Sequence, residues 1–287
     1  MTKPVTAVAA MMLVEDGKIG LAAKLSTYLP ELSDLKVGVE TPDPRTGAKS
    51  LALVNPERQP TIQDVMRHTA GFVYGFLGSG LVDQAYREAD LLNPRITTAS
   101  MISRLSTLPL AYQPGSKFEY SISSDVLGRV VEVVSGETLD KYIEHRIATP
   151  LGLKSFKFHV ERGREWAYSP IRATMTKDGD ADSAAHEDPT LLSGGGGLYA
   201  TAADYLRFAQ MLLNGGELDG VRILAPSTVA LMTHNHLGPE VQVAPSMRQL
   251  LLDIAPTLEM GQGFGLGFAV RVSDGLNPLP GSVGDFD

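Results

Sequence analysis

The chain has 287 residues, of which 43% are hydrophobic, enough for one large domain or two interleaved ones with a sizeable core. Its formal net charge is -8, which repels phosphate backbones and anionic lipids, so we expect neither nucleic acid nor a membrane as a partner. The chain contains no cysteine, which excludes disulfides, thiolate metal sites and a cysteine nucleophile but leaves the redox compartment open.

The N-terminal segment comes nearest to a targeting signal. Lys3 precedes an apolar stretch over residues 5–14, but Glu15 and Asp16 follow it directly, without a small-residue cleavage pattern. No apolar run reaches the ~20 residues that a membrane-spanning helix needs. We therefore expect a soluble protein, cytoplasmic as the sequence stands, whose compartment stays open because an export signal would lie upstream of Met1.

Helical patterns outnumber strand patterns along most of the chain. Residues 4–15 predict a helix that stops before the Asp16-Gly17 turn. Residues 123–135 predict another, with one apolar stripe and a stop at Gly136. Thr61 with Asp64, and Thr201 with Asp204, have the spacing of capping boxes at helix starts. A further helix is predicted over residues 138–147 and ends before Pro150, and residues 194–197 predict a tight glycine turn.

Only one strand is clear from the sequence. Glycines alternate with bulky apolar residues over residues 263–268, and Val270 and Val272 continue the period of two. A single strand can neither bury its own faces nor satisfy its edges. We therefore expect its partners either in irregular sequence or outside this chain.

Lys3 is the first candidate catalytic residue. A serine at the start of a helix and a lysine three residues later lie on one face, so the lysine can accept or relay the hydroxyl proton. Lys3 fits the lysine, but the serine would stand directly before Met1, and we expect the nucleophile outside this chain. Taken alone, a lysine near an N-terminus is more often solvated.

Tyr120 is the second candidate, and it lies in extended sequence just before the helix predicted over residues 123–135. A phenol beside a lysine ammonium can have a lowered pKa and act as general base toward a serine, then as acid toward a leaving group. Taken alone, a tyrosine at a helix entrance is more often a packing or capping residue.

Other motifs carry less weight. Residues 33–36 repeat the serine-to-lysine spacing, but no amphipathic helix follows them. His234 and His236 have no third ligand at a useful spacing, so we expect no metal, and no organic cofactor is implied. Residues 263–267 are too tightly spaced for a dinucleotide fingerprint, and a Gly-x-Ser-x-Gly elbow is missing, which speaks against the α/β-hydrolase fold.

Together these segments resemble the β-lactamase-related serine hydrolases, the family of class C β-lactamases, D-alanyl-D-alanine carboxypeptidases and family VIII carboxylesterases. Residues 1–17 resemble the stretch after the catalytic serine, residues 65–71 the His-Thr-Ser-Gly signature, residues 114–120 the approach to the catalytic tyrosine, residues 193–208 the glycine-rich turn and helix, and residues 263–268 the strand before the last catalytic motif. Five matches in order are more specific than any one of them.

The resemblance implies an α+β, multi-domain fold of the β-lactamase and transpeptidase type. It places the central helix in residues 1–20, a mostly helical domain with the tyrosine motif in residues 21–257, and a strand portion of the α/β domain in residues 258–287. Most of the antiparallel sheet, including the strand that supplies an oxyanion-hole amide, is then expected outside the chain. We accordingly expect a chain truncated at both ends.

The resemblance also implies roles for single residues. Lys3 becomes the lysine of the serine-lysine pair, Tyr120 the catalytic tyrosine and Ser123 a substrate-binding residue. Lactamases of this group carry an asparagine two residues after the tyrosine, where this chain has Ile122. The missing amide favours an esterase that acts on small carboxylic esters through an acyl-enzyme.

Two alternatives stay open. The first is a β-lactamase or D-alanyl-D-alanine carboxypeptidase. The second is a catalytically dead fragment or pseudo-enzyme, because the nucleophile is expected outside the chain. The expected partners are a small acyl ester or a β-lactam, together with further copies of this chain, since uncovered apolar faces favour self-association.

Overall fold

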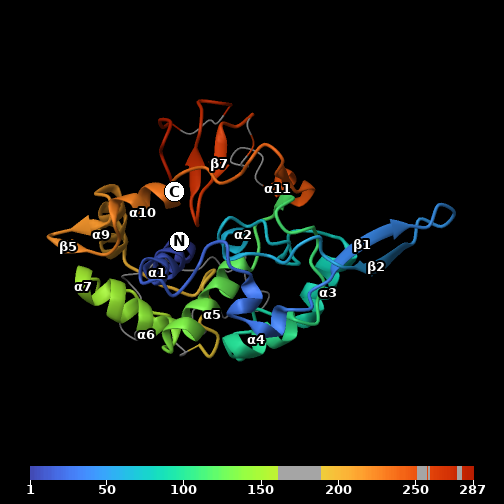
Figure 1. Cartoon of the computed structure of the whole chain (residues 1–287), viewed down its shortest axis with the longest axis horizontal. Coiled ribbons are helices and arrows are strands. Elements are labelled where there is room, and N and C mark those ends of the chain that lie inside the picture. Colours follow the sequence, from blue (N-terminus) through green and yellow to red (C-terminus); the bar gives the residue numbers. More distant parts are fainter. Residues whose placement is uncertain (161–188, 251–256, 258, 277–279) are drawn as a thin grey trace.

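The structure is a computed structural model that describes residues 1–160, 189–250, 257, 259–276 and 280–287 (Figure 1). Its helices are α1 (Thr2–Glu15), α2 (Ile62–Met66), α3 (Leu81–Ala89), α4 (Thr98–Leu105), α5 (Ser123–Ser135), α6 (Leu139–Ile143), α7 (Thr149–Leu151), α9 (Ala202–Leu213), α10 (Pro226–Met232) and α11 (Pro245–Leu250), with 3-10 turns at Leu25–Thr27 and Pro30–Leu32 and a π-helical turn at Glu144–Ala148. Across the described ranges, no helix has the length and apolar character that crossing a membrane requires.

The strands form short pairs. They are β1 (Val37–Pro42), β2 (Lys49–Val54), β3 (Lys117–Phe118), β4 (Glu217–Leu218), β5 (Val221–Arg222), β6 (Gln242–Val243), β7 (Gln262–Phe264) and β8 (Ala269–Arg271). The pairs β1–β2, β4–β5 and β7–β8 are antiparallel, and β3–β6 is parallel. The fold thus combines helices with sheets, as expected. That further strands of a larger sheet lie outside residues 1–287 stays a prediction.

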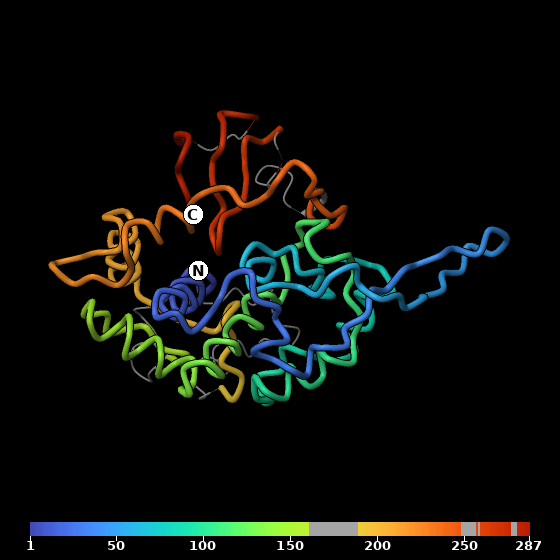
Figure 2. Tube along the Cα trace, viewed as in Figure 1, coloured from blue at the N-terminus to red at the C-terminus, as the bar shows by residue number. Residues whose placement is uncertain are grey.

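Helix α1 lies at the centre of the molecule, close to α5 and α6 (Figure 2). Every residue from Val5 to Leu13 is 6% exposed or less. A helix that is apolar on all sides must be buried, and this one forms the middle of the core. The helix predicted over residues 4–15 is therefore confirmed, with a start two residues earlier.

The predicted caps are also present. The Thr61 side chain accepts a hydrogen bond from the Asp64 N–H, and the Asp64 carboxylate in turn accepts from the Thr61 N–H, which completes the capping box of α2. Thr201 accepts from the N–H of Asp204 at the start of α9. The helix α5 ends at Gly136, whose φ of 76° lies in the left-handed region that glycine tolerates. These helix boundaries follow from local sequence.

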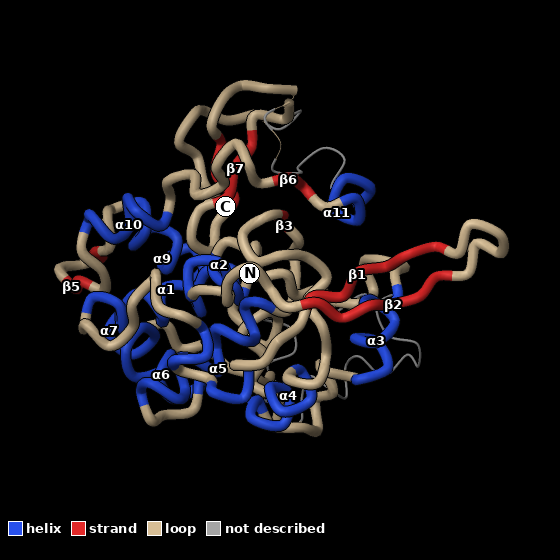
Figure 3. Tube along the Cα trace, turned by 45° about the vertical axis from the view of Figure 1, so that its right-hand side comes forward, coloured by secondary structure: helices blue, strands red, loops and turns tan. Residues whose placement is uncertain are grey.

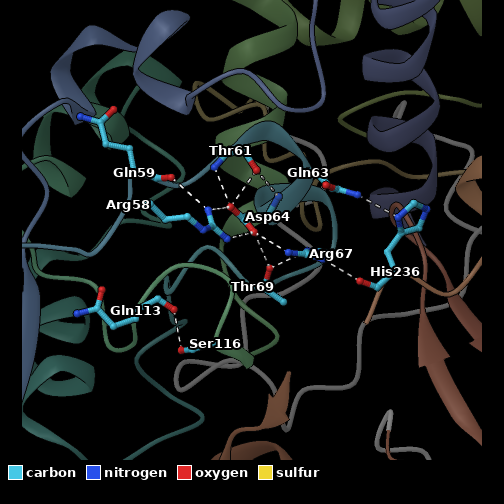
Figure 4. A network of polar contacts seen from close by, with 10 residues as sticks. All are labelled: Arg58, Gln59, Thr61, Gln63, Asp64, Arg67, Thr69, Gln113, Ser116 and His236. Carbon is cyan, nitrogen blue, oxygen red and sulfur yellow. Dashed lines mark hydrogen bonds and ion pairs between the residues drawn. The ribbon is translucent and has the colours of Figure 1, made fainter. Parts of the chain in front are cut away.

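A buried carboxylate ties α2 to the C-terminal part of the chain (Figure 4). Asp64 is 0% exposed and accepts from the Arg58 guanidinium at 2.9 Å and the Arg67 guanidinium at 2.9 Å. Burial alone would raise the pKa of Asp64, but the hydrogen bond from Arg58, together with those from Thr61 and Arg67, holds it to about 2. Arg67 also donates to the carbonyl of His236 at 2.8 Å. The network connects the signature-like segment over residues 65–71 to the loop between α10 and β6.

The prediction of one long strand over residues 263–272 is wrong. The chain forms the hairpin β7–β8, with Gln262 paired to Arg271 and a turn over residues 265–268. Gly267 in this turn has a φ of 94°. Residues 284–287 run along the other edge of β8, where Ala269 and Asp287 exchange backbone hydrogen bonds. A period of two continues through a tight turn, so the pattern alone does not reveal the reversal.

The sequence interpretation missed the hairpin β1–β2, which projects from the body of the molecule (Figure 3). Every residue of β2 is at least partly exposed, so it has no buried face and no apolar alternation. The predicted end of a helix before Pro150 is also wrong. After α6 the chain continues through the π-helical turn and α7 to Gly152, because a proline in the first turn of a new helical segment lacks only a donor that would be unpaired there.

Candidate active site

Lys3 lies in the first turn of α1 and points across to the tyrosine segment. Its Nζ lies 4.5 Å from the ring centroid of Tyr120 and 5.6 Å from that of Tyr74, and it donates to the carbonyl of Gly195 at 2.8 Å. The structure therefore brings together Lys3 and Tyr120, which are 117 positions apart and were both selected from the sequence. The ammonium lies over the ring face, the geometry of a cation–π contact.

Burial lowers the pKa of the Lys3 ammonium below its usual range, and the charge of Asp125 partly offsets this effect. The first turn of a helix also disfavours a positive charge, since the N-terminal N–H groups carry positive partial charge. A lysine amine with a lowered pKa is neutral more often near neutral pH. It is therefore better able to accept a proton.

Tyr120 lies between β3 and α5, and its backbone N–H donates to the sulfur of Met247 at 3.3 Å. Burial raises the pKa of the Tyr120 phenol to about 12, and the carboxylates of Asp125 and Asp287 act in the same direction. The expectation that the neighbouring ammonium would lower this pKa is thus wrong, because burial and two carboxylates dominate. Tyr120 keeps its proton at neutral pH.

A buried carboxyl group, that of Asp125, holds in place the residue whose carbonyl accepts from Lys3, Gly195. Asp125, in the first turn of α5, accepts from the Ser193 hydroxyl at 2.5 Å and from the Gly195 N–H at 3.0 Å. A Cβ on Gly195 would lie 2.4 Å from Asp125 Oδ2, so only glycine fits this approach. The predicted glycine turn over residues 194–197 is confirmed and presents the Gly195 carbonyl to Lys3.

Lys3 and Tyr120 share the wall of a cavity of about 360 Å³. The other lining residues are mostly aromatic or small: Met1, Pro4, Phe118, Tyr205, Phe264, Gly267, Ala269 and Asp287. Met1 and Asp287 face the same cavity, and the two chain ends lie near each other in Figure 2. No serine, threonine or cysteine is among these lining residues, so the described wall offers phenols but no aliphatic hydroxyl.

A larger cavity, of about 790 Å³, lies beside the hairpin β1–β2 and α3. It shares no lining residue with the cavity of Lys3 and Tyr120. Glu119 lines the larger cavity, whereas the neighbouring Tyr120 lines the smaller one, because successive residues of an extended segment point to opposite sides. The lysine and tyrosine define the candidate active site at the smaller cavity.

Ser123, predicted to bind substrate, lies elsewhere. It is 0% exposed, its Oγ lies 2.8 Å from that of Ser121, and it does not line the cavity of Lys3 and Tyr120. Sequence reasoning passed over His68, which does not line this cavity but contacts Tyr120. The ring centroid of His68 lies 4.7 Å from that of Tyr120. The signature-like segment over residues 65–71 contained the signal, but its contact with Tyr120 is visible only in three dimensions.

The fold is of the β-lactamase and transpeptidase type. The protein-family model described as Beta-lactamase matches residues 1–284. The chain therefore belongs to the beta-lactamase family.

The chain is similar to the following proteins. Protein Rv1367c of Mycobacterium tuberculosis is 36% identical over 299 residues, which span 100% of this chain and 69% of that protein. Lovastatin esterase of Penicillium rubens is 29% identical and covers 95% of this chain and 69% of its own length. The solved structure of EstCE1, described as a hydrolase with promiscuous acyltransferase activity, superposes with a TM-score of 0.72 at 30% identity, over 99% of this chain and 71% of EstCE1.

Proposed function

We propose that this chain supplies the lysine and tyrosine of a serine hydrolase that cleaves small carboxylic esters through an acyl-enzyme. The observation that carries the proposal is the position of Lys3 Nζ, 4.5 Å from the ring centroid of Tyr120 in the wall of a cavity of about 360 Å³. A basic amine and a phenol beside one cavity are the groups that a serine nucleophile needs for proton transfer.

The shifted pKa values of Lys3 and Tyr120 suit different proton-transfer roles. Lys3, with its lowered pKa, accepts the proton of the attacking serine hydroxyl as its oxygen bonds to the ester carbonyl carbon. Tyr120, protonated at neutral pH, donates a proton to the alkoxide that leaves, and recovers one from Lys3. Water then attacks the acyl-serine ester and releases the carboxylic acid. The serine and both side chains return to their first state.

Several features favour an ester over a β-lactam or a peptide. The cavity wall is mainly aromatic and apolar, and Ile122 stands where lactamases of this group carry an asparagine, so an amide group of a substrate finds no matching side chain there. The similar proteins include lovastatin esterase and EstCE1, a hydrolase with promiscuous acyltransferase activity. A β-lactamase or D-alanyl-D-alanine carboxypeptidase is the alternative within the family.

In this proposal the nucleophile is a serine directly before Met1, three positions ahead of Lys3. Met1 lines the cavity, so a serine preceding it would start beside both catalytic candidates. Residues 1–287 alone are expected to hydrolyse esters negligibly, because loss of a nucleophile removes about 10⁶-fold in rate in well-studied serine hydrolases. A fluorophosphonate probe should label none of their serines.

The test compares two chains that carry either serine or alanine directly before Met1, behind an initiator methionine. The serine chain should turn over p-nitrophenyl butyrate faster than the alanine chain and take up one fluorophosphonate per molecule. Lys3→Met and Tyr120→Phe in the serine chain should each reduce this turnover about 100-fold or more. Equal rates in the serine and alanine chains would refute the placement of the nucleophile. Preferred turnover of nitrocefin would refute the ester assignment.

A further inference from the structure

His68 has an unusual conformation for a buried residue. It follows α2, its φ is 57°, and it is 2% exposed. A residue with a Cβ rarely adopts this left-handed region, and the conformation is strained, so it persists only where the surroundings fix it. Here the surroundings do fix it. The Phe118 ring lies edge-on at 6.1 Å and the Phe264 ring edge-on at 5.5 Å, centroid to centroid.

The histidine holds the backbone on both sides of Tyr120. Its carbonyl oxygen accepts from the N–H of Glu119 at 2.9 Å, and its ring Nδ1 accepts from the N–H of Ser121 at 3.2 Å. Between these two hydrogen bonds the His68 ring lies tilted against the Tyr120 ring, with 4.7 Å between the ring centroids and 31° between the planes. One residue thus makes contacts with three consecutive residues, of which Tyr120 is the middle one.

The Ser121 N–H also determines the protonation of the ring. Because Nδ1 accepts from a backbone donor, it carries no proton, and the neutral ring holds its proton on Nε2. Burial, together with the charge of Lys3, lowers the pKa of His68 to about 3. A second proton on the ring would place a donor against the Ser121 N–H and a second cation beside Lys3.

We propose that His68 is the positioning residue of Tyr120, and that its ring Nδ1, by accepting from the Ser121 N–H, sets the phenol against Lys3. The inference rests on the proposed function only where it treats Tyr120 as a proton donor. The position of the Tyr120 ring itself is a property of the chain and can be measured without any substrate.

The first measurement needs no substitution. Nitrogen NMR of the histidines should show His68 as the Nε2–H tautomer, with an unprotonated Nδ1 and no titration between pH 8 and pH 5. His145→Asn, at an exposed position paired with Glu137, removes one histidine signal and serves as a control for the assignment. A His68 ring that is protonated on Nδ1, or that titrates near pH 6.5, would overturn the proposal even if every variant failed to fold.

The second measurement compares His68→Asn with His68→Gly. Both replacements tolerate a left-handed backbone, but only asparagine retains an acceptor, Oδ1, at the place of Nδ1. Nuclear Overhauser contacts between the Lys3 side chain and the Tyr120 ring, assigned with Tyr120→Phe, should persist in His68→Asn and disappear in His68→Gly. The contacts between the stacked rings of Tyr74 and Phe76 serve as a control for intact folding. If the Lys3–Tyr120 contacts persist in His68→Gly, the hydrogen bond does not position the phenol. The same follows if they disappear in His68→Asn while the Tyr74–Phe76 contacts remain.

An activity assay separates this proposal from the proposed function. In the chain with serine before Met1, His68→Gly should lower kcat about 100-fold with little change in KM, and His68→Asn should restore most of it, because a displaced catalytic group costs turnover more than binding. If that chain is inactive while the two NMR results hold, the proposed function fails and the positioning role stands. If esters are hydrolysed equally by both His68 variants, the positioning role fails alone.

Discussion

Two neighbouring residues of the tyrosine segment, Glu119 and Tyr120, line different cavities. Tyr120 faces Lys3, whereas Glu119 is 2% exposed on the other side and accepts from the Ser246 hydroxyl at 2.6 Å. Burial raises the pKa of Glu119 to about 7, and the Ser246 hydrogen bond opposes this only in part. A carboxyl group of this kind changes its charge in the physiological range, next to a candidate catalytic residue.

Glu119→Gln should remove a pH-dependent part of the stability. A folded-state pKa of about 7, above the reference value of 4.5, means that the folded chain binds more protons than the unfolded chain between these pH values. Stability therefore falls as pH rises from 4.5 to 7. The variant should match the wild type near pH 4.5 and exceed it by about 3 kcal/mol at pH 8, since one pKa unit corresponds to 1.36 kcal/mol.

Urea unfolding at pH 4.5 and pH 8 measures this difference, because glutamine retains the acceptor for Ser246 but cannot ionise. Glu57→Gln, at an exposed position, is the matched control and should show no such pH-dependent gain. An equal effect of Glu119→Gln at both pH values would exclude a raised pKa for this carboxyl.

At the residue scale, the sequence identified Lys3 and Tyr120 but not their electrostatics. Spacing and position near a helix start made each residue a candidate, and the family resemblance implied its role. The pKa of Tyr120 is raised mainly by burial, which only the packed structure creates, and further by the charges of Asp125 and Asp287. The contact of His68 with Ser121 spans 53 positions, and no local pattern encodes it.

At the scale of elements, the turn of the hairpin β7–β8 lies directly against the central helix. Gly267 has a φ of 94°, and a Cβ there would lie 2.4 Å from the Cβ of Ala7 in α1. Gly284 has a φ of 96°, but a Cβ on it would meet nothing within 4 Å. The two glycines thus share their backbone conformation and differ in their neighbours.

Gly267→Ala should therefore destabilise the chain more than Gly284→Ala. Both variants carry the cost of a left-handed alanine, roughly 1–2 kcal/mol. Only Gly267→Ala also forces the hairpin away from α1, which adds about 1–3 kcal/mol of overpacking. Thermal unfolding of the two variants measures the difference. Equal losses would mean that the hairpin does not pack on α1 as described.

Elements with their own stop and start signals were predictable. Helices α1, α2, α5 and α9 begin or end at caps and turns that the sequence contains. The hairpin β1–β2 and the reversal at Gly267 were not predictable, for different reasons. In the first, β2 has no buried residue and so shows no alternation of buried and exposed positions, and the second interrupts an alternation that continues unchanged on either side.

At the scale of the whole molecule, the core is well formed but some apolar side chains remain uncovered. Leu206 and Leu213 on α9 are 66% and 69% exposed, and their separation of seven positions places both on one face of the helix. Leu53 on the projecting strand β2 is 60% exposed. Single exposed leucines are ordinary, but two on one helix face form an apolar patch whose exposure to water is unfavourable.

We expect residues 1–287 to associate with further copies of themselves through the exposed face of α9. Sedimentation should show a mass that rises with concentration, and the double variant Leu206→Glu with Leu213→Glu should shift the chain toward the monomer, because burying two carboxylates in a contact is unfavourable. Val133→Glu, at a 43% exposed position on α5, is the control and should leave association unchanged. A wild-type chain that stays monomeric at all concentrations and melts in one sharp cooperative step would contradict this expectation.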